Sequence, residues 1–538
     1  MEKYSITDKT TEGYVFNLLD NYFKNHGFVE IQKESFETLL YRILPNIITL
    51  EPDLVVPITK NKKYIVSFSE LFIDKPYIIE EDRNIRYITP YEARVRNLTY
   101  DAPLSVNINT KLIENDIIVE EINHNKVSIA RIPIMVKSSK CNLYGKTGKE
   151  NIKVGECSND AGGYFIVKGN ERVIVAQERL NYNNVYIFGQ KKASKFKYVA
   201  EIRSMSDITG HSVLVQAKIS MNGRNVTFSI PYIQQEIPVG VIFKAMGLND
   251  DEIKNLFPDT PDFEKFITYI IRDSYFVDTR EKALEYIGQF SMHVIASDKI
   301  IPYTKQIIEN EMFPHLGISP NSKETILFLS LILQKLILTF VGKRPVDDRD
   351  HISNKRIDTT GILIGDIFRS LFKRLIKSLE LQLTKRQDVI TVMARFNSIS
   401  QGIRHCFATG NWGVQKNAYI KTGVSQILSR LTFIATVSHL RRLVISVGKE
   451  GKNTQIRQIH QSQFGFVCNV ESPEGHAAGI VKNFALLTKI SKKIPTNLVI
   501  DVVNTLKNFI SLEELDFTEA SFLPKILING VWTGSTKN

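Results

Sequence analysis

The chain has 538 residues, of which 43% are hydrophobic and 23% charged. This is enough apolar material for roughly three or four domain-sized units, and too much for a disordered protein. The formal net charge of +12 and the pI near 9.2 favour a polyanionic partner, although many basic proteins bind none.

Other features argue against zinc-bound, secreted and membrane classes. The four cysteines show no CxxC spacing, and the first residues lack the apolar core of a signal peptide. The apolar run from Ile326 to Val341 is short for a membrane span and is interrupted by Gln334 and Lys335. We therefore expect a buried helix there.

The first segments alternate between helical and extended patterns. Residues 11–26 carry apolar side chains at helical spacing and end at Gly27, which predicts an amphipathic helix with a glycine cap. Alternating patterns predict strands at residues 64–68, 86–88, 117–122 and 128–136. For Arg94 and Arg96, a solvated strand face is as good an explanation as a functional role.

Glycine turns predict two hairpins. One spans residues 162–175 and turns at Gly169, and the other turns at Asn222–Gly223, a type I′ signal. Capping-box patterns begin two later helices, at Asn249 with Glu252 and at Asn321 with Glu324. We expect Arg172 and Arg179, on the first hairpin and after it, to hold the fold.

Three acidic residues resemble a two-metal phosphoryl-transfer site: Asp347, Asp348 and Asp350. The alternative is an ion network, because cations lie within a few residues and are able to neutralise every acid: Arg344, Arg349, Lys355 and Arg356. We favour the network, and name no metal ligand in this chain.

The most informative stretch is residues 407–487. It opens with the loop Thr409–Gly413 and continues with apolar residues from Val424 to Leu440 at helical spacing. A second glycine loop occupies residues 448–452. Basic residues occur throughout the stretch, among them Arg430, Arg441, Arg442, Arg457 and His460. Basic side chains between glycine turns on a rigid core are typical of a surface that binds a polyphosphate chain, such as nucleic acid.

The last residues predict a hairpin that turns at Asn529–Gly530. Its return strand would begin at Val531 and stop almost at once, and so small a hairpin buries little by itself. We therefore expect its remaining sheet to come from another polypeptide, or the sequence to be a fragment.

Longer motifs carry a resemblance to a known family. They occur in order: GGYFIVKGNERVIVAQERL, DDRDHISNKRIDTTG, TGNWG, GVSQILSRLTFIATVSHLRR, IRQIH and ESPEGHAAGIVKN. Together they resemble the N-terminal half of the second-largest (β-type) subunit of multisubunit DNA-directed RNA polymerases. The wording of the motifs is similar to eukaryotic and large-DNA-virus members, and the chain resembles one half of a split subunit.

The resemblance implies a multidomain α+β fold with mixed sheets and helices. A discontinuous protrusion would occupy residues 1–200 and 341–409, interrupted by a lobe at residues 201–340. The fork would follow at residues 410–483, and residues 484–538 would begin a truncated external domain.

The resemblance also implies template-directed RNA synthesis as part of a complex, with no activity in the isolated chain. The expected partners are the largest subunit, a polypeptide carrying the second half of this subunit, smaller subunits, template DNA and the transcript. Magnesium would be held mainly by the largest subunit. The implied location is the nucleus, or the host cytoplasm or virion for a virus.

Site residues follow from the same resemblance. Lys416, Lys421 and Gln426 would lie near the RNA–DNA hybrid and neutralise phosphates. Lys449 and Lys452 would lie where downstream DNA strands separate, although GKEGKNTQIRQIH departs from the family pattern there. Arg457 and Glu474 would support the mobile elements of the active centre, or form an ion pair that fixes the fork.

Two other classes remain. A stand-alone basic nucleic-acid-binding module predicts tight, salt-dependent binding by the purified chain. A phosphotransferase using the three aspartates predicts activity that single substitutions abolish. The polymerase hypothesis predicts that neither property is strong without partner subunits.

Overall fold

The computed structural model describes residues 11–59, 61–115, 117–190, 194–206, 208–292, 296–317, 322–385, 389–413, 421–446, 454–491, 496–528 and 531–537. The chain forms two compact units, Met1–Thr488 and Lys489–Asn538. Both mix helices with sheets, which confirms the predicted α+β class.

The chain begins with helices α1 (Thr11–His26), α2 (Glu30–Thr38) and α3 (Leu44–Thr49). The predicted helix and its cap are confirmed: Gly27 has φ +70°, and its N–H donates to Phe23 at 3.1 Å. The apolar face of α1 is not a core face, however, because Val15 and Leu18 are 55% and 71% exposed.

The first sheet is antiparallel, in the order β1-β2-β5-β6. Its strands are β1 (Leu54–Thr59), β2 (Lys62–Ile73), β5 (Asp101–Glu114) and β6 (Ile117–Pro133). The two strands predicted between residues 117 and 136 are one strand, β6, with irregular register in the middle. In β5, alternate side chains are buried, as expected for a sheet covered on one face.

Between β2 and β5 lie a small hairpin, β3 (Tyr77–Ile79) and β4 (Ile85–Tyr87), and helix α4 (Pro90–Val95). The proposed strand face for Arg94 and Arg96 is therefore wrong: Arg94 lies on α4 and Arg96 follows it. Thr89 stabilises the start of α4, because its hydroxyl accepts the N–H of Glu92 at the N-cap.

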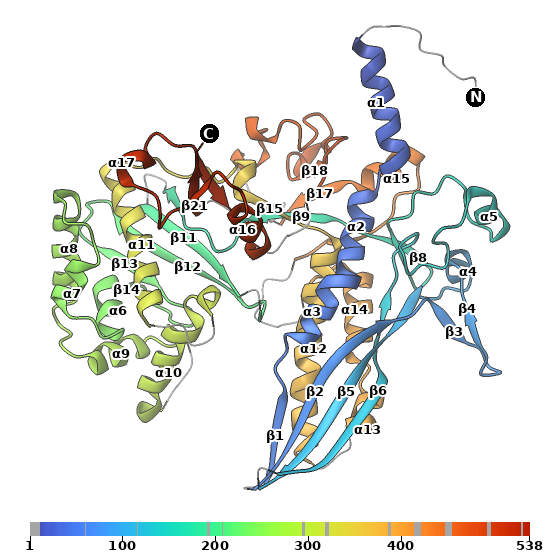
Figure 1. Cartoon of the computed structure of the whole chain (residues 1–538), viewed down its shortest axis with the longest axis horizontal. Helices are drawn as coiled ribbons and strands as arrows, with labels where there is room; N and C mark the ends of the chain where they lie inside the picture. The colour runs from blue at the N-terminus through green and yellow to red at the C-terminus, as the bar shows by residue number, and fades with distance from the viewer. Residues whose placement is uncertain are drawn as a thin grey trace. The chain divides into compact units, whose positions relative to one another are not determined.

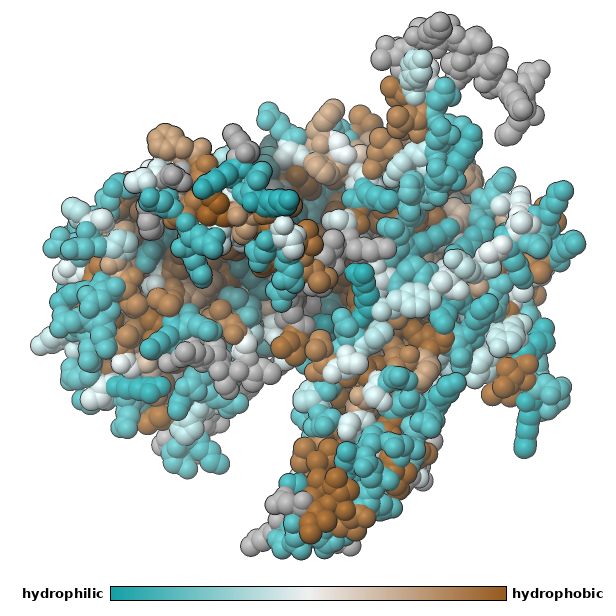
Figure 2. Space-filling view, in the orientation of Figure 1, coloured by the Kyte–Doolittle hydropathy of each residue, from teal (hydrophilic) through white to brown (hydrophobic). Residues whose placement is uncertain are grey.

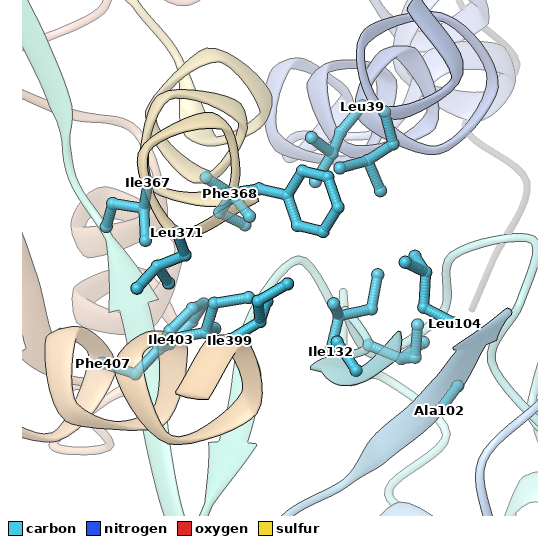
Figure 3. Packing of buried hydrophobic residues seen from close by; sticks show 14 of the residues in the cluster. Leu39, Ala102, Leu104, Ile132, Ile367, Phe368, Leu371, Ile399, Ile403 and Phe407 are labelled. Carbon is cyan, nitrogen blue, oxygen red and sulfur yellow. The ribbon is translucent and has the colours of Figure 1, made fainter. Parts of the chain in front are cut away.

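Three helices pack on the first sheet: α12 (Thr360–Leu383), α13 (Val389–Arg395) and α14 (Ser398–Thr409) (Figure 1). Figure 3 shows Phe368 of α12 with Ile399 and Ile403 of α14, facing Leu104 and Ile132 of the sheet. These side chains belong to a first hydrophobic core formed by residues 29–175 and 363–440.

Gln32 of α2 joins distant parts of this core and is 4% exposed. Its amide nitrogen donates to the carbonyls of Ile174 at 3.2 Å and Leu440 at 3.0 Å, while its oxygen accepts from Thr360. Since a buried amide needs all its partners, Gln32 fixes the register of four segments.

The predicted hairpin near Gly169 is confirmed as β7 (Phe165–Val167) and β8 (Asn170–Ile174), preceded by α5 (Gly148–Lys153). β16 (Ser425–Ile427) adds to β8. A further sheet has the order β15-β9-β17-β18, from β9 (Ala176–Leu180), β15 (Lys355–Asp358), β17 (Arg442–Ile445) and β18 (Val481–Asn483).

A second hydrophobic core contains residues from 185 to 337 only, so residues of the first core flank it in the sequence. Its sheet comprises β10 (Tyr186–Gly189), β11 (Phe196–Met205), β12 (Ser212–Ser220), β13 (Val226–Ser229) and β14 (Ile237–Pro238). Its helices are α6 (Val239–Ala245), α7 (Asp250–Asn255), α8 (Pro261–Asp273), α9 (Arg280–Gly288), α10 (Ile300–Gln306) and α11 (Ser322–Val341).

Several predictions concern this core. The capping box at Asn249 and Glu252 is confirmed, whereas Asn321 lies outside the described residues. β12 and β13 form the second hairpin, but Asn222 does not have the positive φ that a type I′ turn requires. Helix α11 is long and apolar enough to cross a membrane, yet Leu333 and Leu336 are fully buried in this core, as expected for a core helix.

The second unit contains α16 (Thr496–Asn504), α17 (Phe517–Ala520) and a sheet in the order β19-β21-β20. Its strands are β19 (Phe509–Ser511), β20 (Lys525–Ile528) and β21 (Val531–Thr536). The predicted hairpin is confirmed as β20 and β21, but the expectation that the strand beside it comes from another polypeptide is wrong, because β21 also pairs with β19 of this chain. The turn residues Asn529 and Gly530 lie outside the described residues.

Candidate nucleic-acid interface

The candidate site is built on a loop anchored by Trp412. Helix α14 ends at Gly410, which has φ +76°, and the chain turns back to the first core. There the Trp412 indole N–H donates to the carbonyl of Leu363 at 2.8 Å, and its ring lies 5.5 Å from that of Phe407. Backbone hydrogen bonds between Trp412 and Lys421 close the loop at its base. Lys416 lies outside the described residues.

The helix predicted from Val424 to Leu440 is only half correct. Residues Ser425–Ile427 form β16, and α15 begins at Phe433, after the N-cap Thr432 whose hydroxyl accepts the N–H of Ala435. Pairing with β8 decides the first half, because Ser425 and Ile427 are register partners of Ile174 and Arg172.

Lys421 and Gln426 are held by other side chains. The Lys421 ammonium lies 3.0 Å from the carboxylate of Asp358, which is 2% exposed and also accepts from Arg179 at 2.7 Å. Arg179 therefore holds the fold, as predicted. Gln426 donates to the carbonyl of Gly423 at 3.0 Å, and its side-chain oxygen lies 2.9 Å from Nε2 of His439.

His439 is a site residue that we did not predict. It is 4% exposed, and its Nδ1 accepts the backbone N–H of Ser429 at 3.1 Å, so Nε2 carries the proton donated to Gln426. Burial, with the nearby Arg442 cation, lowers the pKa of His439 to about 4. The neutral ring thus fixes the turn between β16 and α15.

Arg441 is buried, at 9% exposed, and acts within the fold. Its guanidinium donates to the carbonyls of Phe28 at 2.7 Å, Ala485 at 2.7 Å and Leu486 at 2.9 Å. Burial lowers its pKa. These bonds occupy the side chain that we predicted to bind nucleic acid. Arg442 is half-buried on β17, and burial lowers its pKa as well.

Arg457 holds the segment that follows Glu474. It donates to the carbonyls of His476 at 2.6 Å and Ala478 at 3.0 Å. Gly479 passes so close to the Arg457 backbone that an added Cβ would lie 2.3 Å from its carbonyl oxygen. Glu474 is exposed and stands at the N-cap of the turn Gly475–Ala477. Arg457 thus fixes the turn that begins at Glu474.

His460 joins the turn Gln461–Gln463 to the returning segment at residues 348–354. Its Nε2 lies 2.8 Å from Asp348, and its Nδ1 lies 2.6 Å from the hydroxyl of Ser462. Ser462 in turn accepts the N–H of Ile352 at 2.9 Å. The backbone N–H of Asp350 and the His460 ring lower the pKa of Asp348.

The acidic cluster is an ion network, though not the one predicted. Arg344 donates to both oxygens of Asp347, at 2.7 and 2.9 Å, but the other nearby cations bind elsewhere. Arg349 pairs with Glu201, and Lys355 with Glu178. Across the part of the chain that the structure describes, no three histidine, cysteine or acidic residues are grouped to hold a metal ion.

Two ion clusters tie the site to the rest of its unit. Glu178 on β9, 4% exposed, accepts from Lys482 on β18 and lies 3.1 Å from Lys355 on β15. Burial alone would raise the pKa of Glu178, but the two ammonium groups hold it below its ordinary value. Lys482 was missed by the sequence reasoning because only the sheet order brings these strands together.

The second cluster surrounds Arg430, one of the basic residues of the predicted helix, which lies between β16 and α15. Its guanidinium bonds Glu171 of β8 at 2.6 and 2.9 Å, and Glu171 also lies 3.2 Å from Arg94. Burial opposes ionisation of nearby Asp160, but hydrogen bonds from Tyr164 and Gly162 and the Arg430 cation lower its pKa. Lys449 and Lys452 lie outside the described residues.

Comparison with protein families gives two matches in chain order. A family described as RNA polymerase beta subunit matches residues 27–404. A second, described as RNA polymerase Rpb2, domain 3, matches residues 426–490 and so includes β16, α15, β17 and β18.

Three relatives illustrate the match. The chain is 32% identical to DNA-directed RNA polymerase II subunit 2 of Arabidopsis thaliana, over 98% of this chain and 47% of the relative. It is 34% identical to a probable RNA polymerase II subunit RPB2 homologue of Invertebrate iridescent virus 6, over 96% and 49%. It is 32% identical to RNA polymerase subunit Rpo2N of Methanocaldococcus jannaschii, over 91% and 98%. The chain spans about half the length of the plant and viral relatives.

Proposed function

Because this chain belongs to the RNA polymerase beta-subunit family, we propose that it serves as the N-terminal half of the second-largest subunit of a DNA-directed RNA polymerase. In this role it contributes to the cleft for DNA and RNA and to the wall of the active centre, while RNA is made from ribonucleoside triphosphates. The supporting observation is the ordered match along the chain, including 98% of the archaeal relative. We assign residues 1–200 and 341–409 to the protrusion, 201–340 to the lobe, 410–483 to the fork and 484–538 to the external region.

The partners in this proposal are the largest subunit, a polypeptide equivalent to the second half of the longer relatives, smaller subunits, template DNA and the transcript. Apolar side chains of the fork support a protein partner there: Leu431, Ile434 and Val470 are 88%, 79% and 90% exposed. Burying such side chains against a partner removes apolar area from water. Relatives in plants and an invertebrate virus suggest a nuclear enzyme, or a viral one in the host cytoplasm or virion.

Within the fork, we assign phosphate neutralisation to Lys416, Lys449 and Lys452. The bonds described above suit Lys421, Gln426 and Arg441 to positioning these loops, and Arg442 is half-buried on β17 beside them. His460 holds the fork on the returning segment, and Arg457 with Glu474 shapes the support for mobile elements of the active centre. Magnesium would be supplied by the largest subunit.

The test begins with affinity purification of the tagged chain from its native source and mass spectrometry of the recovered proteins. Recovery of a largest subunit and a polypeptide equivalent to the second half supports the proposal. Recovery of this chain alone, with tight salt-dependent nucleic-acid binding, would favour the stand-alone binding module instead.

The recovered complex then allows a test of the site. Replacing Lys449 and Lys452 by Gln should weaken template binding and reduce its salt slope by about two, one for each lost phosphate contact. Lys254→Gln is the matched control, because Lys254 pairs with Asp251 on an exposed surface of the second core. Equal slopes in both variants would remove the two fork lysines from the interface.

A further inference from the structure

Strand β6 forms an open edge of the first sheet. Its inner edge pairs with β5, and among the described residues no strand pairs with its outer edge. From Ile117 to Ser128, every residue except His124 and Val127 is exposed. Unpaired N–H and C=O groups of such an edge are a template for another strand.

The side chains along this edge are unusually apolar for an exposed strand. Ile117, Ile118 and Val119 are 70%, 51% and 59% exposed, and Ile122 is 40% exposed. Figure 2 shows apolar surface at the end of this sheet. Ile122 is the register partner of Thr110, which is 2% exposed, so Ile122 shares the face of the sheet that carries the core. An apolar residue added beside Ile122 would extend that core.

The opposite edge of the same sheet is closed to strand addition. β1 spans only Leu54–Thr59 and contains Pro57, which has no N–H to donate. β6 has no proline before Pro133, its last residue. The register between β6 and β5 shifts beside Val119 and again between His124 and Val127, and the pairing is regular between these two shifts.

The charges near this stretch indicate what would pair with it. Glu120 is exposed, and Glu121 lies 3.2 Å from Lys111 and accepts from Asn109 at 2.8 Å. Pairing with a second copy of β6 would bring these carboxylates together, and like charges across strands are destabilising. A basic strand meets no such repulsion.

We propose that the edge of β6 from Ile117 to His124 is a strand-addition site for an extended segment of a partner protein that combines basic and β-branched residues. Backbone hydrogen bonds provide the affinity, and Ile122 and Glu120 select apolar and basic side chains. This site is separate from the fork, and it stands whether or not the proposed polymerase role is correct.

The test measures binding of a fluorescent nonapeptide of alternating lysine and valine to the full chain, by anisotropy in 0.15 M salt. We expect Ile122→Lys to weaken binding at least about tenfold, because it adds a charge where an apolar contact forms. Val55→Lys on β1 adds the same charge to the other edge, at a residue 50% exposed, and should change binding less than about twofold. Glu120→Lys, on an exposed residue, is a second variant of the same edge and should also weaken binding of the basic peptide, because Glu120 selects basic side chains.

A fully N-methylated peptide of the same sequence keeps the charge but cannot donate backbone hydrogen bonds. Loss of its binding, with slower amide exchange at residues 117–124 in the presence of the parent peptide, supports strand addition. The proposal is overturned if the methylated peptide binds as tightly as the parent peptide, or if Ile122→Lys and Val55→Lys change binding by the same factor. It is also overturned if the parent peptide does not bind at millimolar concentration.

Discussion

Arg430 lies over the ring of Tyr164, with its guanidinium carbon 4.8 Å from the ring centroid. The contact joins the segment between β16 and α15 to the start of hairpin β7–β8. A cation over an aromatic face, backed by carboxylates, is a stable arrangement. The segment around Arg430 is therefore attached to hairpin β7–β8 through side chains as well as through β16.

Replacing Arg430 by Ala should lower the free energy of unfolding by about 1–2 kcal/mol. The side chain is 41% exposed, so solvent screens its pairs, and Arg94 continues to neutralise Glu171. Urea unfolding in a Trp532→Phe background measures this, because Trp412 is then the one tryptophan and reports the first core. Arg430→Lys should lose less, and a loss above about 3 kcal/mol would contradict the screening argument.

Replacing Arg441 by Ala should cost about 3–5 kcal/mol, because three buried carbonyls lose a charged donor. The same fluorescence measurement applies. Arg442→Ala, next in the chain but half-buried, is the matched control and should cost less. If Arg441→Ala weakened nucleic-acid binding without changing stability, the structural role would be refuted.

The free energy of unfolding should depend on pH through His439. Its folded pKa of about 4 lies below the ordinary value of 6.5, so the unfolded chain binds the proton first as pH falls. The stabilisation is fully present above pH 6.5 and is lost as pH falls toward 4. Unfolding curves at several pH values, compared with His439→Gln, measure this. Identical pH profiles for the two chains would exclude His439 as the source.

Glu178 should also make the free energy of unfolding depend on pH, in a lower pH range than His439. Its pKa is depressed in the folded chain, so its stabilisation is present above the ordinary value of 4.5 and is lost as pH falls through the folded pKa. Glu178→Gln leaves Lys355 and Lys482 buried without a counter-charge and should cost about 3–5 kcal/mol at pH 7. The difference should shrink below pH 4.5. A constant difference would show that packing, and not charge, is lost.

Elements governed by local signals could be predicted from the sequence. The helix from Thr11 ends at Gly27 because a positive φ at glycine is cheap, and Asn249 with Glu252 satisfies helix N–H groups within one turn. The first hairpin turns at Lys168 and Gly169, both with positive φ. Each of these signals lies within a few residues of the element that it defines.

Elements decided by distant partners could not be predicted. Apolar spacing from Val424 to Leu440 fits a helix, yet the first part is a strand because it pairs with β8, about 250 residues earlier. At the end of the chain, we expected the partner strand to be missing. Instead β21 pairs with β19 within the second unit.

The candidate site shows the same limit. Arg441 looks like a phosphate ligand in the sequence, and only the nearby carbonyls of Phe28, Ala485 and Leu486 show that it is buried and occupied. The family resemblance identified the family correctly because it compares the whole ordered stretch. It did not distinguish side chains that hold the loops from those that project from them.

The hydrogen bond from Gln32 to Leu440 spans 408 residues. At about 5–20 residues per second, a ribosome needs roughly 20–80 s to travel from one to the other. During that time all residues of the second core emerge, while Gln32 still lacks its partners at Thr360 and Leu440. The middle of the chain can therefore fold on the ribosome before its beginning is complete, and the first core is the part most in need of protection from aggregation during synthesis.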